Sequence, residues 1–253
     1  MTRTGHCGFF LVFLGLSLCV ACNHSSAPQA PASNRPAVKA APVDAAVAAT
    51  ISGTVSFDGT PPTPKHIDMS NDPGCKGNAA SEQILVDDGH LANVLVYVKD
   101  GLGNLAFDPS NQVVTIRQEG CRYVPHVAAV MTGQVVRFED NDPTLHNIHS
   151  MPRQNREWNQ SQMPNSQPID KTFTAPELMI PVKCNQHPWM QMYISVLGNP
   201  FFAVTGQDGK FSLQGLPPGT YTIAAVQEKY GEKTQVLTVG ARENKTISFN
   251  YQP

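Results

Sequence analysis

The chain has 253 residues, enough for one or two domains, and 18 Lys and Arg against 20 Asp and Glu give it a formal net charge of −2. Because the charge is near zero and no basic run occurs, we do not expect nucleic acid as a partner. The 19 Gly and 21 Pro lie between short apolar runs, which favours an all-β fold.

The first 22 residues have the pattern of a secretory signal peptide, with a positively charged start and an apolar run too short to span a bilayer. The run ends in Leu18-Cys19-Val20-Ala21-Cys22, which resembles the cleavage box of a bacterial lipoprotein, although Cys19 stands where Leu is usual. The resemblance implies that Cys22 becomes the acylated first residue of an exported chain, held on a bacterial membrane by lipid alone. The alternative is ordinary cleavage near Ala21 and release as a soluble protein.

Residues 23–49 are rich in Ala, Pro and Ser and contain almost no large apolar side chain. Such a segment cannot bury a core, so we expect a disordered, semi-extended linker. A linker behind a lipid anchor would let the folded part reach a partner above the membrane, either in a periplasm or at the cell surface.

Short apolar runs bounded by turn residues predict strands from residue 50 onward. They cover 51–57, 84–86, 94–98, 113–116, 127–130, 135–138, 178–184, 192–196, 202–205, 210–213, 221–226, 236–239 and 247–251. The run 94–98 is apolar at every position, which predicts a central strand of a sandwich. Residues 60–83 and 139–172 are polar or rich in turn formers, and we expect them to be mainly loop.

The cysteines divide into two groups. Three of the six lie within the first 22 residues, which leaves Cys75, Cys121 and Cys184 in the folded part. An exported compartment is oxidising, so two of these three should pair. We expect a Cys75–Cys121 disulfide, because Cys184 lies among other metal-binding side chains. The alternative for Cys184 is a buried structural thiol.

A thiol, an imidazole and a thioether occur within seven residues, at Cys184, His187 and Met190, and His146 lies upstream in a His-Asn-Ile-His run. Two imidazoles, one thiolate and a weak axial thioether are the ligands of a blue copper site. We therefore predict that these four residues hold one copper ion. Met192 is the alternative axial ligand, although its spacing also fits the core face of a strand.

Period-two alternation places Cys184 on the same face as Leu178, Ile180 and Val182, so the thiol should point into the core. Zinc is a poor alternative metal, because it rarely takes a thioether ligand. No His-x-His pair, Ser/His/Asp arrangement or phosphate loop is evident. We therefore expect no catalysis by this chain alone.

Residues of about 111–198 resemble a cupredoxin of the amicyanin or plastocyanin type, on the strength of the Leu145–His149 run and the Cys184–Met190 loop. The resemblance implies a Greek-key sandwich or barrel. It implies that Asn147 ties the His146 strand to the Cys184 loop and that the nearby His149 is not a ligand. It also implies that His187 presents one ring edge at the surface, within a small apolar patch of Pro188 and Trp189 where a redox partner docks.

Residues 50–100 and 199–251 resemble the two parts of a carboxypeptidase regulatory-like, transthyretin-like sandwich, through runs such as Ile51–Phe57 and Leu216–Tyr221. Whether the cupredoxin is inserted into this sandwich or lies beside it stays open. The expected division is a signal peptide (1–22), a linker (23–49), a first part of the regulatory-like sandwich (50–108), the cupredoxin domain (109–198) and the second part of the sandwich (199–253).

The function expected from these features is that of a membrane-tethered type I copper protein. It would carry single electrons between exported redox partners such as a c-type cytochrome or a dehydrogenase. The alternatives are a copper delivery or storage protein and a non-catalytic module that binds glycan or protein.

Overall fold

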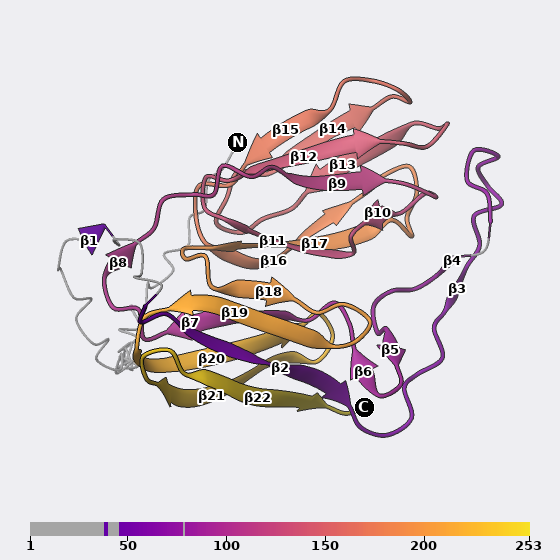
Figure 1. Cartoon of the computed structure of the whole chain (residues 1–253). Coiled ribbons are helices and arrows are strands. Elements are labelled where there is room, and N and C mark those ends of the chain that lie inside the picture. Colours follow the sequence, from indigo (N-terminus) through magenta and orange to yellow (C-terminus); the bar gives the residue numbers. More distant parts are fainter. Residues whose placement is uncertain (1–37, 40–45, 78) are drawn as a thin grey trace, which may run out of the picture. The chain divides into compact units, whose positions relative to one another are not determined.

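The computed structural model describes residues 38–39, 46–77 and 79–253 (Figure 1). The expected signal peptide, the lipidation residue Cys22 and most of the linker lie outside these residues. The described part consists of strands and turns without a helix, so it contains no helix that could cross a membrane. The expected all-β fold is confirmed.

Strands from both ends of the described chain build one sandwich, here called the terminal sandwich (Figure 1). One sheet has the order β18-β7-β20-β21 and the other β19-β2-β6-β5, with β22 also paired to β2. Its strands are β2 (Ala49–Phe57), β5 (Val86–Asp87), β6 (His90–Leu91), β7 (Leu95–Asp100), β18 (Phe202–Val204), β19 (Lys210–Leu216), β20 (Gly219–Gln227), β21 (Gly231–Val239) and β22 (Asn244–Tyr251).

The second sandwich, here called the inserted sandwich, lies in sequence between β7 and β18, which are themselves paired. Its sheets have the orders β10-β9-β12-β15 and β11-β17-β16-β13-β14. The strands are β9 (Val114–Gln118), β10 (Tyr123–Val124), β11 (Val127–Met131), β12 (Val135–Asp140), β13 (His146–Ser150), β14 (Trp158–Gln162), β15 (Ile169–Thr172), β16 (Glu177–Lys183) and β17 (Gln191–Leu197). Because β7 and β18 pair with each other on either side of it in sequence, the second sandwich is inserted into the terminal sandwich.

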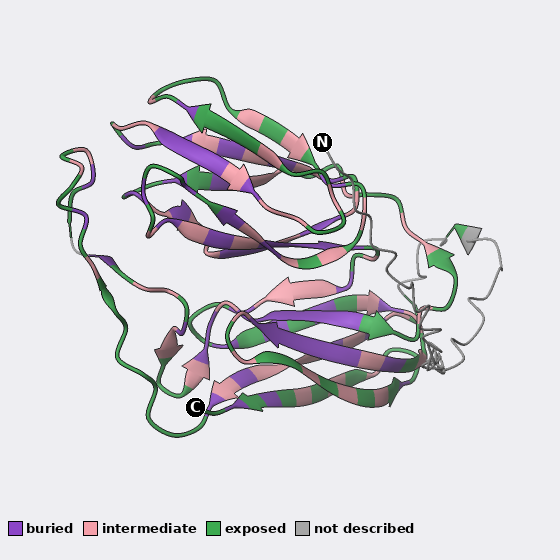
Figure 2. Ribbon diagram, turned by 180° about the vertical axis from the view of Figure 1, so that it is seen from behind, coloured by how far each residue is buried: buried purple, intermediate pink, exposed green. Residues whose placement is uncertain are grey.

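Burial explains why these runs form strands. β7 is buried at four consecutive positions, whereas β21 alternates between exposed and partly buried residues (Figure 2). Val96 and Val98 of β7 face the core of the terminal sandwich, while Leu95 and Tyr97 pack in a smaller cluster with Leu197 of β17. β7 lies between β18 and β20, so the predicted central strand is confirmed.

Two expectations about secondary structure need correction, and a third is incomplete. Residues 139–172 contain three polar strands, β13, β14 and β15, that the sequence did not predict. Leu178 does not share the face of Cys184: it is 37% exposed, because a bulge between Glu177 and Ile180 shifts the alternation. The segment 23–49 is not entirely linker, because β1 (Val38–Lys39) pairs in parallel with β8 (Leu105–Ala106).

Residues 66–80, here called the covering segment, carry the short hairpin β3 (His66–Ile67) and β4 (Ala79–Ala80). This stretch lies within the part assigned from sequence to the regulatory-like sandwich. Its buried side chains Met69, Cys75 and Ala79 instead pack in the core of the inserted sandwich. A disulfide between Cys75 and Cys121 joins the segment to the turn between β9 and β10.

Candidate metal centre

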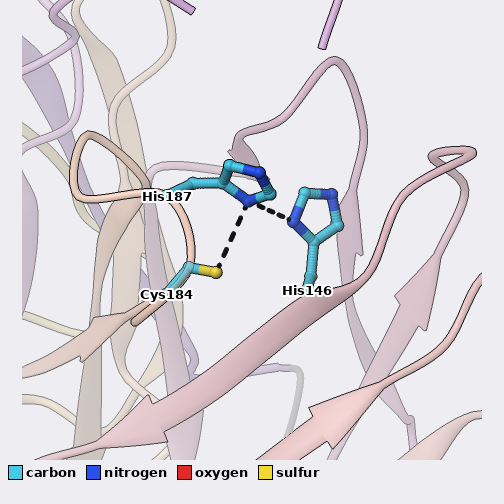
Figure 3. A group of neighbouring side chains, drawn as sticks. All are labelled: His146, Cys184 and His187. Carbon is cyan, nitrogen blue, oxygen red and sulfur yellow. Dashed lines mark hydrogen bonds between the residues drawn. The ribbon is translucent and has the colours of Figure 1, made fainter. Parts of the chain in front are cut away.

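Three side chains meet in the core of the inserted sandwich: His146 from β13, and Cys184 and His187 from the turn between β16 and β17 (Figure 3). The Nδ1 atoms of His146 and His187 are 3.0 Å apart, and Sγ of Cys184 lies 3.7 Å from Nδ1 of His187. His146 is fully buried, and the other two residues are each 3% exposed. Cys184 is the free cysteine of the described residues.

The hairpin between β16 and β17 positions the thiol. Cys184 follows the last residue of β16, and its N–H donates a hydrogen bond to the Met190 carbonyl oxygen. The Met190 N–H in turn donates to the His187 carbonyl oxygen, which closes a tight turn. Because Val182 pairs with Met192, continuing the register puts Cys184 opposite Met190. Met190 is therefore nearer to Cys184 along the strand pair than Met192, which lies two residues further along β17.

Asn147 links β13 to the same turn. Its backbone N–H donates to Sγ of Cys184 at 3.3 Å, and its side-chain Oδ1 accepts from the Asn185 N–H at 3.1 Å. The side-chain amide also contacts Asn159. Asn147 therefore orients the thiol and the turn that carries it, with hydrogen bonds on both sides of the residue.

A carboxylate lies on the outer nitrogen of each histidine. Nε2 of His146 is 2.9 Å from Oδ2 of Asp142, and Nε2 of His187 is 2.9 Å from Oδ2 of Asp72. Asp72 also accepts hydrogen bonds from the Thr144 hydroxyl and the Gly74 N–H. A proton on each Nε2 satisfies these contacts and leaves both Nδ1 atoms with a lone pair toward the centre.

Two lone pairs that face each other at 3.0 Å repel, so the centre needs a cation between them. Burial lowers the pKa of His146, but hydrogen bonds to Asp142 and Cys184 outweigh it and raise that pKa to about 9. Burial raises the pKa of Cys184, but hydrogen bonds from His146 and from backbone N–H groups lower it to about 7. Between pH values of about 7 and about 9 the centre therefore combines a thiolate with an imidazolium, and a metal ion can replace the imidazolium proton.

Hydrogen bonds from His187, Thr144 and the Gly74 N–H lower the pKa of Asp72 to about 2. Burial raises the pKa of Asp142, but its bonds to His146 and to the Cys121 and Gly120 N–H groups lower it overall. Both carboxylates are therefore charged at neutral pH. Their negative charge makes the histidines better donors toward a cation.

The expected exposure of His187 is wrong. The covering segment places Asp72 over Nε2 of this ring, and Sγ of Cys75 lies 3.6 Å from the same nitrogen. Pro188 is exposed, as the expected surface patch requires. Trp189 is half-buried: its ring centroid is 5.1 Å from that of His187, and its Nε1–H donates to the Cys121 carbonyl oxygen.

A group of buried polar side chains lies next to His146. Gln162 pairs with His146 across β13 and β14, and its Oε1 accepts from Nε2 of Gln118 at 2.7 Å. Gln118 pairs with Asp140 across β9 and β12. Oε1 of Gln118 and Oδ2 of Asp140 are buried without a hydrogen-bond partner in the described structure. Buried acceptors of this kind favour a positive charge nearby.

The remaining histidines of the described residues stand apart from the three-residue group. His149 contacts Asn185 and Glu157, and His126 contacts the Gln191 carbonyl oxygen and Glu228. The contacts of Asp72 and Asp142 with the two histidines were not predicted from the sequence. Asp142 lies four residues before His146, a spacing that could have suggested the contact, whereas no local pattern connects Asp72 to a histidine 115 residues away.

The comparisons with known proteins cover parts of the chain. A family model for the carboxypeptidase regulatory-like domain matches residues 187–252, which is less than half of the sequence. The range begins at His187 and continues through β17 to β22. No curated protein matches the chain.

Among the solved structures that match, the following three are similar to about a third of the chain. A copper-containing nitrite reductase from Thermus scotoductus SA-01 matches with 21% identity and a TM-score of 0.32, over 35% of this chain and 23% of its own length. A purple cupredoxin from Nitrosopumilus maritimus matches with 18% identity and a TM-score of 0.29, over 33% and 99%. A reduced Cu(I) form of an amicyanin variant matches with 19% identity and a TM-score of 0.31, over 36% and 92%.

Proposed function

We propose that this chain is a type I copper protein that carries single electrons and is not itself an enzyme. The observation that supports it is the convergence of two Nδ1 atoms and one thiol sulfur in a buried site, with the Nδ1 atoms 3.0 Å apart. This donor set suits copper in both oxidation states, because thiolate is soft and imidazole serves Cu(I) and Cu(II). His146, Cys184 and His187 would hold the ion, with Met190 as the axial ligand.

Bound copper would supply one-electron chemistry between Cu(I) and Cu(II). The chain's own residues lower the pKa of the Cys184 thiol, exclude water and fix both imidazole rings. Asp142 and Asp72 hold the rings through their outer nitrogens, and Asn147 holds the sulfur. Fixed ligands favour electron transfer, because little rearrangement accompanies a change in oxidation state.

The route for the electron would pass through Trp189 rather than through an exposed edge of His187. Trp189 contacts the His187 ring and reaches partial exposure beside Pro188. A small surface of this kind suits the brief docking of a redox partner such as a c-type cytochrome or a dehydrogenase. The lipid anchor at Cys22 would keep the exchange in the periplasm or at the cell surface.

Burial of the ligands favours a carrier over a delivery or storage protein. The covering segment closes the outer side of His187 and is fixed there by the Cys75–Cys121 disulfide. A protein that hands over its metal needs a ligand that a partner can reach. A carrier instead benefits from slow release, because the metal stays bound through many turnovers.

The test is the visible spectrum of the exported chain after loading with Cu(II). We expect an intense thiolate-to-copper band that disappears in Cys184→Ser and persists when Cys75 and Cys121 are both changed to Ala. A colourless wild-type protein, or a band that survives Cys184→Ser, would refute the ligand assignment. Rapid loss of the metal to a chelator would favour delivery over electron transfer.

A further inference from the structure

The disulfide lies beside the two histidines of the proposed copper site. Sγ of Cys75 is 3.6 Å from Nε2 of His187. Ligand atoms of Asp72, Cys75 and His187 lie within 4.8 Å of one another, and so do those of Cys121, Asp142 and His146. The Cys75 sulfur thus contacts the outer nitrogen of the His187 ring, whereas the Cys184 sulfur contacts the inner one.

As a disulfide, these sulfurs are weak ligands, because the thiolate is the form that binds metals. After reduction, two thiolates would stand on backbone positions whose Cα atoms are 5.5 Å apart. Paired thiolates select Cu(I), which accepts a low coordination number and soft donors. An imidazole nitrogen is already in place beside one of the two sulfurs.

We propose that the reduced Cys75 and Cys121 pair, together with Nε2 of His187, forms a second metal site that takes Cu(I). This site does not use Cys184 and therefore does not depend on the electron-carrier function. Binding there replaces the hydrogen bond between His187 and Asp72. Asp72 keeps its bonds from the Thr144 hydroxyl and the Gly74 N–H.

Opening the site requires a dithiol reductant. A thiolate of the reductant attacks the sulfur of Cys75, the S–S bond breaks, and Cys121 leaves as a thiolate that takes up a proton. The second thiol of the reductant then displaces Cys75 and leaves the reductant as a disulfide. Two electrons and two protons have moved to the protein, and Cu(I) binding releases the two thiol protons again and also the Nε2 proton of His187, whose Nδ1 takes over the proton shared with Nδ1 of His146.

The location of the second site suits the entry of copper into the protein. The inner centre is closed to solvent, and the covering segment lies over His187. A Cu(I) ion held by the two thiolates would be separated from the inner position by one imidazole ring. The reduced pair thus offers a sulfur-rich entry point for copper.

The experiment uses the exported chain with Cys184→Ala, which removes the inner thiolate. One sample is kept oxidised, and another is reduced with a phosphine that is removed under anaerobic conditions. Both are titrated with Cu(I) in competition with a chromophoric Cu(I) chelator. We expect the reduced sample to retain one equivalent and the oxidised sample to retain none. A matched variant that also carries Cys75→Ala and Cys121→Ala should retain none after reduction.

Equal retention by the oxidised and reduced samples would overturn the proposal, and so would retention by the matched variant. Loss of the near-ultraviolet circular dichroism of the reduced sample before copper is added would overturn it as well, because the site requires the folded sandwich. X-ray absorption of the copper-loaded sample should report two sulfur scatterers. The visible band of the Cys184-containing protein tests the carrier function separately, so the two ideas can fail independently.

Discussion

Removing the Cys75–Cys121 disulfide should destabilise the protein strongly while leaving the proposed copper site intact. The bond closes a loop with a sequence separation of 46 residues, for which the entropy of loop closure predicts about 4 kcal/mol at 25 °C. The double change to Ala is preferable to Ser, because Cys121 is fully buried and a hydroxyl there would lack a partner. The loop also joins the two sandwiches, since β5 to β8 lie within it.

The assay is urea unfolding of the metal-free protein under non-reducing conditions, followed by circular dichroism. With a denaturant slope of about 2 kcal/mol per M, a loss of about 4 kcal/mol moves the midpoint down by about 2 M. Wild-type protein treated with a reductant is the matched control and should unfold at the same midpoint as the variant.

A shift below about 0.5 M would refute the entropic reasoning and would mean that the covering segment already holds the loop closed through its other contacts. Loss of the copper band in the variant would refute a different step. It would mean that the disulfide, rather than Asp72, orients His187.

The remaining predictions concern the copper site. Met190→Leu should change the visible spectrum and the reduction potential of the copper-loaded protein. Met192→Leu should leave both unchanged and should lower the free energy of unfolding, measured in urea, by less than about 1.5 kcal/mol. The reverse result would make Met192 the axial ligand. Asp142→Asn should weaken copper binding by about 10–100-fold in a chelator competition without changing the fold, and unchanged affinity would show that this carboxylate does not orient His146. Copper affinity should rise with pH up to about 9, because copper must displace a proton from His146 below its pKa of about 9. The rise should be steepest below pH about 7, where copper must also displace a proton from Cys184, whose pKa is about 7. A copper affinity that is independent of pH would contradict these protonation states.

Much of the fold could be predicted because its signals are local. Alternation of apolar residues marks β2, β12 and β20, and the turn residues between the runs mark their ends. The close spacing of Cys184, His187 and Met190 likewise lies within one hairpin. The nearest competing interpretation, Met192, follows from the same strand register, since it differs from Met190 by one period of the alternation.

The errors arose where the local signal was weak or interrupted. β13 to β15 contain many polar residues, some of them buried beside the metal centre, so their sequence is typical of loops. Leu178 was placed on the wrong face because a bulge inserts an extra residue, with Met179 at a positive φ of 53°. Neither hydropathy nor spacing reports such an insertion.

The covering segment shows why the surroundings of a metal site are harder to predict than its ligands. A ligand set has a chemical signature, whereas a residue such as Asp72 needs only to reach one nitrogen from any part of the chain. It reaches His187 because the disulfide fixes Cys75 three residues away and because Thr144, from the turn before β13, holds the carboxylate. The cysteine count predicted the covalent link but gave no reason to place it at the candidate metal centre.

The position of the disulfide covers the edge of His187 through which an electron was expected to leave. It also puts Trp189 in contact with both the His187 ring and the Cys121 carbonyl oxygen. In the proposed carrier, an electron leaving toward the surface at Pro188 would therefore pass an aromatic ring whose orientation depends on the turn that the disulfide holds.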